Sequence, residues 1–223
     1  MTRDQLAGAA EAALGGGRRL ERVERLTGGT RKGVYRLAMD DATSAIAYLW
    51  EEADALTWGL RCLTDAATRD PRITNAHDQL GRRLHGLAAA ISPRAEYSVV
   101  HGELGLDHVL VDRRGRPVII DVEDLMYYDV EWEHVFLRLR LHADYHHVAV
   151  DGLDEARLAL YMLVQRLSLT AGPLRLLETD FPDREFFRGI VEHNLREALL
   201  WLSEPTSPAR IACCSRQCWP GNS

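Results

Sequence analysis

Two short polar segments carry the residues of this chain whose types and spacing could do chemistry. The first runs from His101 to His108 and reads HGELGLDH, and the second, IDVE, contains Asp121 and Glu123. Each segment adjoins a short apolar run typical of a β-strand. Glu103 stands in a glycine-rich loop, where a carboxylate could act as a general base or orient a hydroxyl nucleophile. His108 and Asp121 are residue types that bind divalent metal ions, and Glu123 could add a further ligand.

The elements around these two segments must bring them together. Apolar residues at 109–111 and 118–120 flank a polar connection that contains Gly115, and this pattern predicts a β-hairpin. If the hairpin pairs around Gly115, His108 and Asp121 lie close together at its open end. The hairpin is therefore the element that we expect to assemble the site.

The remainder of the chain predicts an α+β protein. Residues 20–26, 34–39 and 44–49 read as three strands of an antiparallel meander, after a short helix at 4–14. A glycine-bearing turn at 27–33 joins the first two strands. This first part is small, so its strands have little apolar cover.

Helical patterns dominate the second part, although residues 51–69 show only weak helical periodicity. Spacing of apolar residues and helix-ending residues predicts four helices, at 71–91, from Val130 onward, at 153–171 before Gly172–Pro173, and at 182–202. The expected domains are a reduced β lobe at 1–55, a helical lobe with the catalytic loop at 56–203, and a disordered tail at 204–223.

Composition narrows the class of protein. The 223 residues are 46% hydrophobic and 27% charged, as in an ordinary soluble domain, and the net charge is −6. This charge disfavours nucleic acid as a partner and could suit a cationic substrate. No apolar stretch reaches the roughly 18 residues of a membrane span, and the N-terminus does not resemble a signal peptide. We therefore expect a cytoplasmic protein with no membrane partner.

Taken in order, the two motifs resemble those of the aminoglycoside phosphotransferase family, whose members have a protein-kinase-like fold. Those proteins move the γ-phosphoryl group of a nucleoside triphosphate to a hydroxyl of a small molecule. The usual family motif is His-Gly-Asp-Leu-His-x-x-Asn, followed by a strand, a turn and Ile-Asp-Trp-Glu. Residues 101–112 and 120–123 of this chain follow that order. The resemblance implies a kinase-like fold with a truncated antiparallel β lobe and a mostly helical lobe that carries a catalytic β-hairpin.

The same resemblance implies roles for single residues. Glu103 takes the place of the catalytic Asp, and His108 takes the place of a metal-binding Asn. Asp121 matches the Asp that holds Mg²⁺, and Asp129 takes the place of an Asp that braces the catalytic loop. His101 belongs to the catalytic loop as well, where a histidine can hydrogen-bond loop carbonyls and fix the turn.

The glycine-bearing turn resembles the nucleotide loop of the same family. Its backbone N–H groups could cradle phosphates, with Gly28, Gly29, Lys32 and Gly33 as the binding residues. The resemblance thus implies ATP or GTP with Mg²⁺ as cofactors, and a small-molecule hydroxyl acceptor as the partner.

Several features depart from the family pattern. Glu103 is one methylene longer than Asp, and His108 offers nitrogen where Mg²⁺ prefers oxygen. Residues 44–50 contain no lysine, although kinases hold the α- and β-phosphates with a lysine on the third strand. Lys32, the one lysine of the chain, stands in the glycine-bearing turn. The interval between the third strand and the first motif is also too short for the rest of a usual N-terminal lobe.

These departures leave three hypotheses open. The first is an ATP-dependent small-molecule phosphotransferase, active or impaired, and the second is a kinase-like remnant that folds or binds without catalysis. The third is a metal-dependent hydrolase that would use His101, His108 and Asp121. Under the first hypothesis, the helical part would recognise the acceptor through acids such as Asp124, Glu131 or Glu133.

Overall fold

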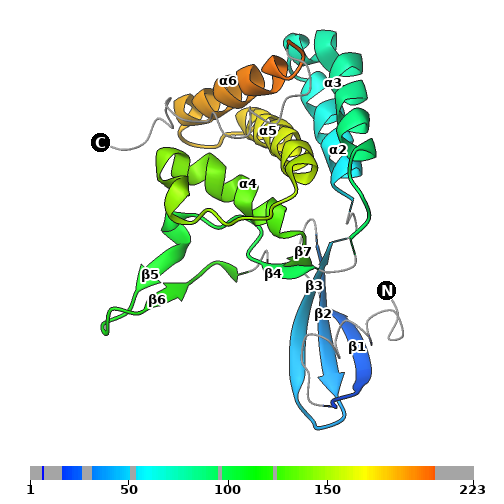
Figure 1. Cartoon of the computed structure of the whole chain (residues 1–223), viewed down its shortest axis with the longest axis vertical. Helices are drawn as coiled ribbons and strands as arrows, with labels where there is room; N and C mark the ends of the chain where they lie inside the picture. Colours follow the sequence, from blue (N-terminus) through cyan, green and yellow to red (C-terminus); the bar gives the residue numbers. More distant parts are fainter. Residues whose placement is uncertain are drawn as a thin grey trace. The chain divides into compact units, whose positions relative to one another are not determined.

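The computed structural model describes residues 7, 17–26, 32–50, 54–94, 97–122 and 125–203. The chain forms two compact units (Figure 1). One unit takes residues 1–53 with 123–126, and the other takes residues 54–122 with 127–223. The helix expected at 4–14 and the tail expected at 204–223 lie outside the described residues, apart from residue 7.

A three-stranded antiparallel sheet makes up the first unit. Its strands follow chain order and are β1 (Leu20–Leu26), β2 (Lys32–Met39) and β3 (Ser44–Trp50). Leu20, Tyr35, Leu37 and Met39 form its small buried core, and Val23 packs against them. The predicted meander is confirmed, with β2 beginning two residues earlier than expected.

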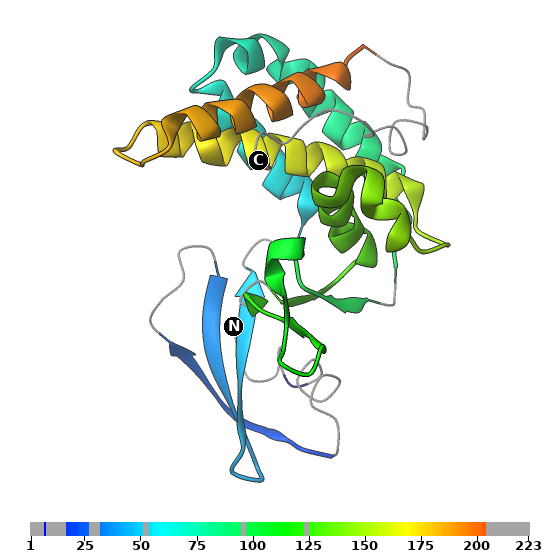
Figure 2. The same ribbon diagram turned by 90° about the vertical axis from the view of Figure 1, so that its left-hand side faces the viewer.

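Five helices of the described residues build the second unit. They are α2 (Ala55–Ala67), α3 (Pro71–Ala89), α4 (Val130–Leu141), α5 (Glu155–Leu177) and α6 (Arg184–Leu200). Helix α5 contacts each of the other four (Figure 2). The main apolar core surrounds it. A 3-10 segment at His142–His147 follows α4.

Helix α2 occupies a segment for which the sequence showed only weak periodicity. The carboxylate of Asp54 caps it by accepting hydrogen bonds from the backbone N–H groups of Leu56 and Thr57. Its buried face consists of Leu63 and four small residues, Ala55, Gly59, Cys62 and Ala66. Residues 55–67 taken alone do have an apolar face, but the range 51–69 also includes polar residues on either side of the helix, which weakened the pattern. Ala55, assigned above to the β lobe, is the first residue of this helix.

Helix α5 does not end before Gly172–Pro173, as predicted, but continues to Leu177 with Pro173 inside it. Proline removes one backbone hydrogen bond and usually ends or kinks a helix. Here Pro173 is itself buried, and Arg175 in the following turn donates a hydrogen bond to the Asp65 carboxylate of α2. Tertiary packing therefore extends the helix past a residue that would normally stop it.

Short strands carry the polar motifs of the second unit. Strand β4 (Ser98–Val100) leads into the first motif, which ends in the 3-10 turn η1 (Leu106–His108). Strands β5 (Val109–Val111) and β6 (Pro117–Ile119) then form the predicted antiparallel hairpin, and β7 (Met126–Tyr128) pairs with β4. A small antiparallel sheet and a helical part with a hairpin confirm the expected α+β, kinase-like fold class. Within the described residues, no helix combines the length and apolar character that crossing a membrane needs.

Candidate active site

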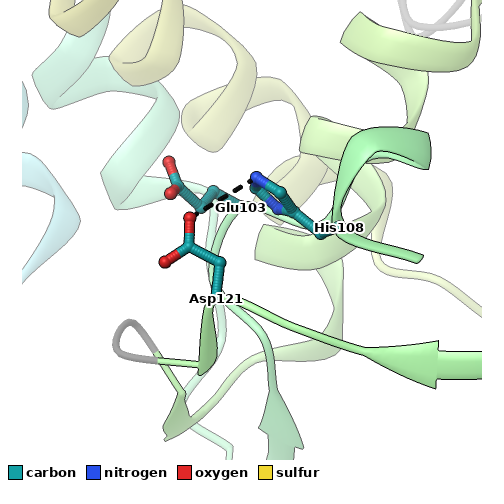
Figure 3. A group of neighbouring side chains, drawn as sticks. All are labelled: Glu103, His108 and Asp121. Atoms are coloured by element: carbon teal, nitrogen blue, oxygen red, sulfur yellow. Dashed lines mark ion pairs between the residues drawn. The ribbon is translucent and has the colours of Figure 1, made fainter. Parts of the chain in front are cut away.

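The β5–β6 hairpin brings the two polar motifs together. Val109 pairs with Ile119, and one step beyond, the N–H of Ile120 donates to the carbonyl of His108 at 2.9 Å. Asp121 follows directly, so its side chain emerges beside the imidazole of His108 (Figure 3). His108 Nε2 lies 3.6 Å from Asp121 Oδ2. The predicted hairpin is therefore what brings His108 and Asp121 together, as expected from the sequence.

A neighbouring loop supplies the third side chain, Glu103. Gly102 before it has φ +96°, a left-handed conformation that glycine adopts without strain. The carboxylate of Glu133 accepts the N–H groups of Gly102 and Leu104, each at 2.8 Å. Trp132 Nε1 also donates to the carbonyl of Gly102 at 3.0 Å. Glu133 therefore fixes the backbone on both sides of Glu103.

Glu103, His108 and Asp121 converge in Figure 3, and their ligand atoms all lie within 4.8 Å of one another. His108 is buried, Glu103 is half-buried and Asp121 is exposed. The 3.6 Å between His108 Nε2 and Asp121 Oδ2 is too long for a hydrogen bond. It does suit two atoms that bind one ion at about 2.1 Å each. The donor set of one imidazole and two carboxylates therefore fits a divalent cation.

Asp121 has an unusual backbone conformation, with φ +58°. Left-handed backbone is costly for most residues, but Asp and Asn tolerate it better than others. Non-glycine residues held in such conformations tend to cluster at functional sites. The turn after β6 thus aims the Asp121 carboxylate at His108 and Glu103 at some conformational cost.

His101 takes a supporting position. Its Nε2 donates to the carbonyl of Ile120 at 2.9 Å, and its ring stacks on His108 with centroids 5.2 Å apart. It therefore links the first motif to the residue before Asp121, which is the carbonyl contact that the sequence suggested. A hydrolase that ligates metal through His101, His108 and Asp121 is not favoured, because Nε2 of His101 is already engaged and His101 lies outside the cluster.

Arg140 on α4 is a site residue that sequence reasoning missed. It donates to Asp107 Oδ1 at 3.0 Å, and its Nη2 lies 4.0 Å from Glu103 Oε2. Gly105 lies beneath it, since a Cβ there would clash with Arg140 Nη1 and Asp107 Oδ1. The only signal in the sequence was the spacing of Arg140 from Glu133, seven residues or two turns along α4.

Asp129 supports the site indirectly, through α5. It is buried, and its Oδ2 accepts hydrogen bonds from Arg157 Nε at 2.9 Å and from the Tyr161 hydroxyl. The resemblance implied that Asp129 braces the catalytic loop, but the side chain that binds the loop backbone is Glu133. Asp129 holds the start of α4 against α5, and Glu133 one turn later holds the loop.

Two acids proposed for acceptor recognition have structural partners instead. Glu131 is fully buried and binds Arg94 through two hydrogen bonds of 2.7 Å, and it also accepts the N–H of Asp154. Burial opposes ionisation, but these bonds outweigh it and lower the pKa of Glu131. Glu133 is committed to the loop backbone. Both carboxylates are thus occupied by the protein itself, and the expectation that Glu131 and Glu133 recognise the acceptor was wrong. Asp124 and Glu123 lie outside the described residues.

The expected nucleotide-loop residues belong to the first unit. Gly28 and Gly29 lie outside the described residues. Lys32 and Gly33 are the first two residues of β2, opposite Trp50 and Leu49 of β3, so Lys32 starts a strand and does not stand in the turn. Their contact with nucleotide stays a prediction.

Comparison with known proteins places this geometry in a family. The model of the phosphotransferase enzyme family matches residues 16–162, more than half of the chain and including every residue of the cluster. The chain therefore belongs to this family, and the resemblance drawn from its two motifs is confirmed. No curated protein sequence matches the chain significantly.

Several solved structures of low sequence identity are similar to the chain. A spectinomycin phosphotransferase in complex with ADP and spectinomycin is 12% identical with a TM-score of 0.37, covering 94% of this chain and 97% of that one. The GDP complex of an aminoglycoside 2′-phosphotransferase is 13% identical with a TM-score of 0.35, covering 88% and 99%. A macrolide 2′-phosphotransferase is 11% identical with a TM-score of 0.29, covering 87% and 96%.

Proposed function

We propose that this protein transfers the γ-phosphoryl group of ATP or GTP to a hydroxyl group of a small molecule. The observation that carries the proposal is the convergence of Glu103, His108 and Asp121, in a chain that belongs to the phosphotransferase enzyme family. Phosphoryl transfer needs a positioned acceptor, a base and compensation of phosphate charge, and little covalent chemistry from the protein. The cluster has residue types for the base and for the charge compensation.

Glu103 would accept the proton of the acceptor hydroxyl as that oxygen attacks the γ-phosphorus. Glu133 and Gly102 keep the backbone of Glu103 in place, so the carboxylate is positioned before the acceptor arrives. His108 and Asp121 would hold a divalent ion such as Mg²⁺, which when bound neutralises charge on the phosphate oxygens.

The nucleotide would bind through the β1–β2 connection, with Gly28, Gly29, Lys32 and Gly33 along the phosphates. Backbone N–H groups of such a turn can bind anions without a lysine on β3. The acceptor would be a hydroxylated and cationic small molecule, in keeping with a net charge of −6. The reaction would take place in the cytoplasm, where nucleoside triphosphates are present.

Nucleotide binding tests the proposal before any acceptor is known. We expect ATP or GTP with Mg²⁺ or Mn²⁺ to raise the melting temperature of the protein, because a ligand that binds only the folded state stabilises it. Asp121→Asn should lose most of this stabilisation, whereas Glu185→Gln, at an exposed acid of α6, should keep it. A melting temperature that no combination of nucleotide and metal ion changes would contradict the proposal.

A kinase-like binding protein without catalysis is the second candidate, favoured by the absence of lysine from β3. The two candidates differ at Glu103. If the protein only binds, Glu103→Gln leaves every measurable activity unchanged. If Glu103 is the base, the same change lowers kcat by about 100-fold or more while nucleotide affinity stays within about twofold.

A further inference from the structure

His108 places an imidazole nitrogen where the family motif has an asparagine, and this difference affects which metal ion the site prefers. Mg²⁺ requires near-octahedral oxygen ligands and is bound mainly by carboxylates, phosphates and water. Imidazole nitrogen suits first-row transition ions instead, and their affinity for nitrogen sites rises from Mn²⁺ towards Cu²⁺. Replacing an amide oxygen by an imidazole nitrogen should therefore shift selectivity between metals.

The position of the ring shows that its nitrogen is available to a cation. His108 is 9% exposed, and its Nε2 lies 3.6 Å from both Asp121 Oδ2 and Asp107 Oδ2. Neither separation is a hydrogen bond. The ring is held by stacking on His101, which is itself fixed by its bond to Ile120. A buried imidazole thus directs Nε2 at carboxylate oxygens without bonding to them.

Charge around the cluster is uneven. Arg140 lies beside Glu103 and Asp107. Within the described part of the chain, Asp121 has no arginine partner, and His108 is its one possible ion-pair partner. Arg140 neutralises charge at Glu103 and Asp107 but not at Asp121. A cation bound between His108 Nε2 and Asp121 would neutralise the Asp121 carboxylate.

We propose that the site formed by Glu103, His108 and Asp121 prefers first-row transition-metal ions over Mg²⁺. Mn²⁺ binds nitrogen most weakly in that series, so it is the most demanding probe of this preference. The inference rests on the proposed function, because it concerns the metal ion that phosphoryl transfer would use there. It adds that His108 sets the choice of metal, so the protein should prefer transition-metal ions over Mg²⁺ in a class for which Mg²⁺ is the expectation.

The test measures metal binding to the full chain without nucleotide or acceptor. Electron paramagnetic resonance reports free Mn²⁺ during a titration, and added Mg²⁺ competes for the same site. We expect wild type to bind one Mn²⁺ through this cluster, and His108→Asn to lower the ratio of Mn²⁺ to Mg²⁺ affinity by at least about tenfold. Asparagine supplies the amide oxygen of the family motif, so this variant should fold and still bind Mg²⁺.

Two further variants make the result specific. Asp121→Asn should weaken the binding of both metal ions, because it removes a shared carboxylate charge. His77→Asn is the matched control, since half-buried His77 lies 3.4 Å from the carboxylate of Asp78 on α3 and also pairs an imidazole with an acid. It should leave the metal ratio unchanged.

An unchanged metal ratio in His108→Asn, or Mn²⁺ binding that survives Asp121→Asn, overturns the inference. This failure is distinguishable from failure of the proposed function. If nucleotide stabilises the protein but the metal ratio does not respond to His108, only the metal inference fails. If Mn²⁺ binds through His108 but no nucleotide binds, the phosphotransferase proposal fails while the metal site stands.

Discussion

Glu133 shows how one residue can control the site without touching a substrate. Its two carboxylate oxygens each accept one N–H from the loop that carries Glu103. A glutamine at this position offers only one carbonyl oxygen, and its amide N–H₂ would face a second N–H donor. We predict that Glu133→Gln frees the backbone around Glu103 and lowers kcat by about tenfold or more through misplacement of the base.

Hydrogen exchange tests this prediction independently of activity. The amides of Gly102 and Leu104 should exchange faster in Glu133→Gln, while amides in the core of α5 should keep wild-type protection. Glu185→Gln on the exposed part of α6 is the matched control. Unchanged protection of the two loop amides would show that Glu133 does not hold the loop.

The sequence predicted the functional residues of the two motifs, but it did not predict the residues that hold them in position. His108 and Asp121 meet because the β5–β6 hairpin pairs, as the sequence pattern predicted, whereas Glu103 is positioned by the loop that Glu133 holds. Glu133 and Arg140 act from a helix that follows in sequence, and their roles depend on how α4 lies against the loop. No local pattern encodes that packing, so Glu133 was mistaken for a residue that binds acceptor, and Arg140 was not noticed.

Close packing of α2 against α5 explains why a glycine stands inside a helix. A Cβ added at Gly59 would lie 2.8 Å from Val164 Cγ2 and 3.3 Å from Leu84 Cδ2. Alanine would favour the helix by about 1 kcal/mol, but overpacking of a core costs about 1–3 kcal/mol. We predict that Gly59→Ala lowers the free energy of unfolding by about 1 kcal/mol.

Urea denaturation of a double-mutant cycle checks the cause. Val164→Ala removes the clashing methyl, so Gly59→Ala should cost less, or stabilise, in that background. If the two changes are additive, contact with Val164 is not what requires glycine here.

Buried titratable groups in the helical unit link stability of the whole molecule to pH. Burial, with Arg138 nearby, lowers the pKa of His134, whose Nδ1 lies 2.9 Å from the Tyr145 hydroxyl. The unfolded chain, with a histidine pKa of about 6.5, then binds a proton more readily than the folded chain. The stability contributed by neutral His134 is present above about pH 6.5 and is lost as pH falls towards its lower folded pKa.

Thermal melts across this range test the sign. The melting temperature of wild type should fall as pH drops from about 7 to about 5. His134→Gln should show a smaller fall, and His85→Gln at an exposed position of α3 should behave as wild type. A fall of the same size in His134→Gln would mean that other groups carry the pH dependence.

A second loss of stability is expected below about pH 4.3. There Glu131, whose pKa is lowered in the folded protein, becomes protonated beside Arg94.

Transfer of phosphate itself is the most direct test of the central claim, that Glu103 and Asp121 form a phosphotransferase site. The full chain would be incubated with ATP or GTP, Mn²⁺ or Mg²⁺ and a panel of hydroxylated amines, and followed by phosphorus NMR. The account predicts a new phosphate-ester signal and matching nucleoside diphosphate with wild type. It predicts ester formation at least about 100-fold slower with Glu103→Gln, and none detectable with Asp121→Asn. Ester formation that persists in Glu103→Gln at the wild-type rate, or no ester with any acceptor and either nucleotide, would contradict it.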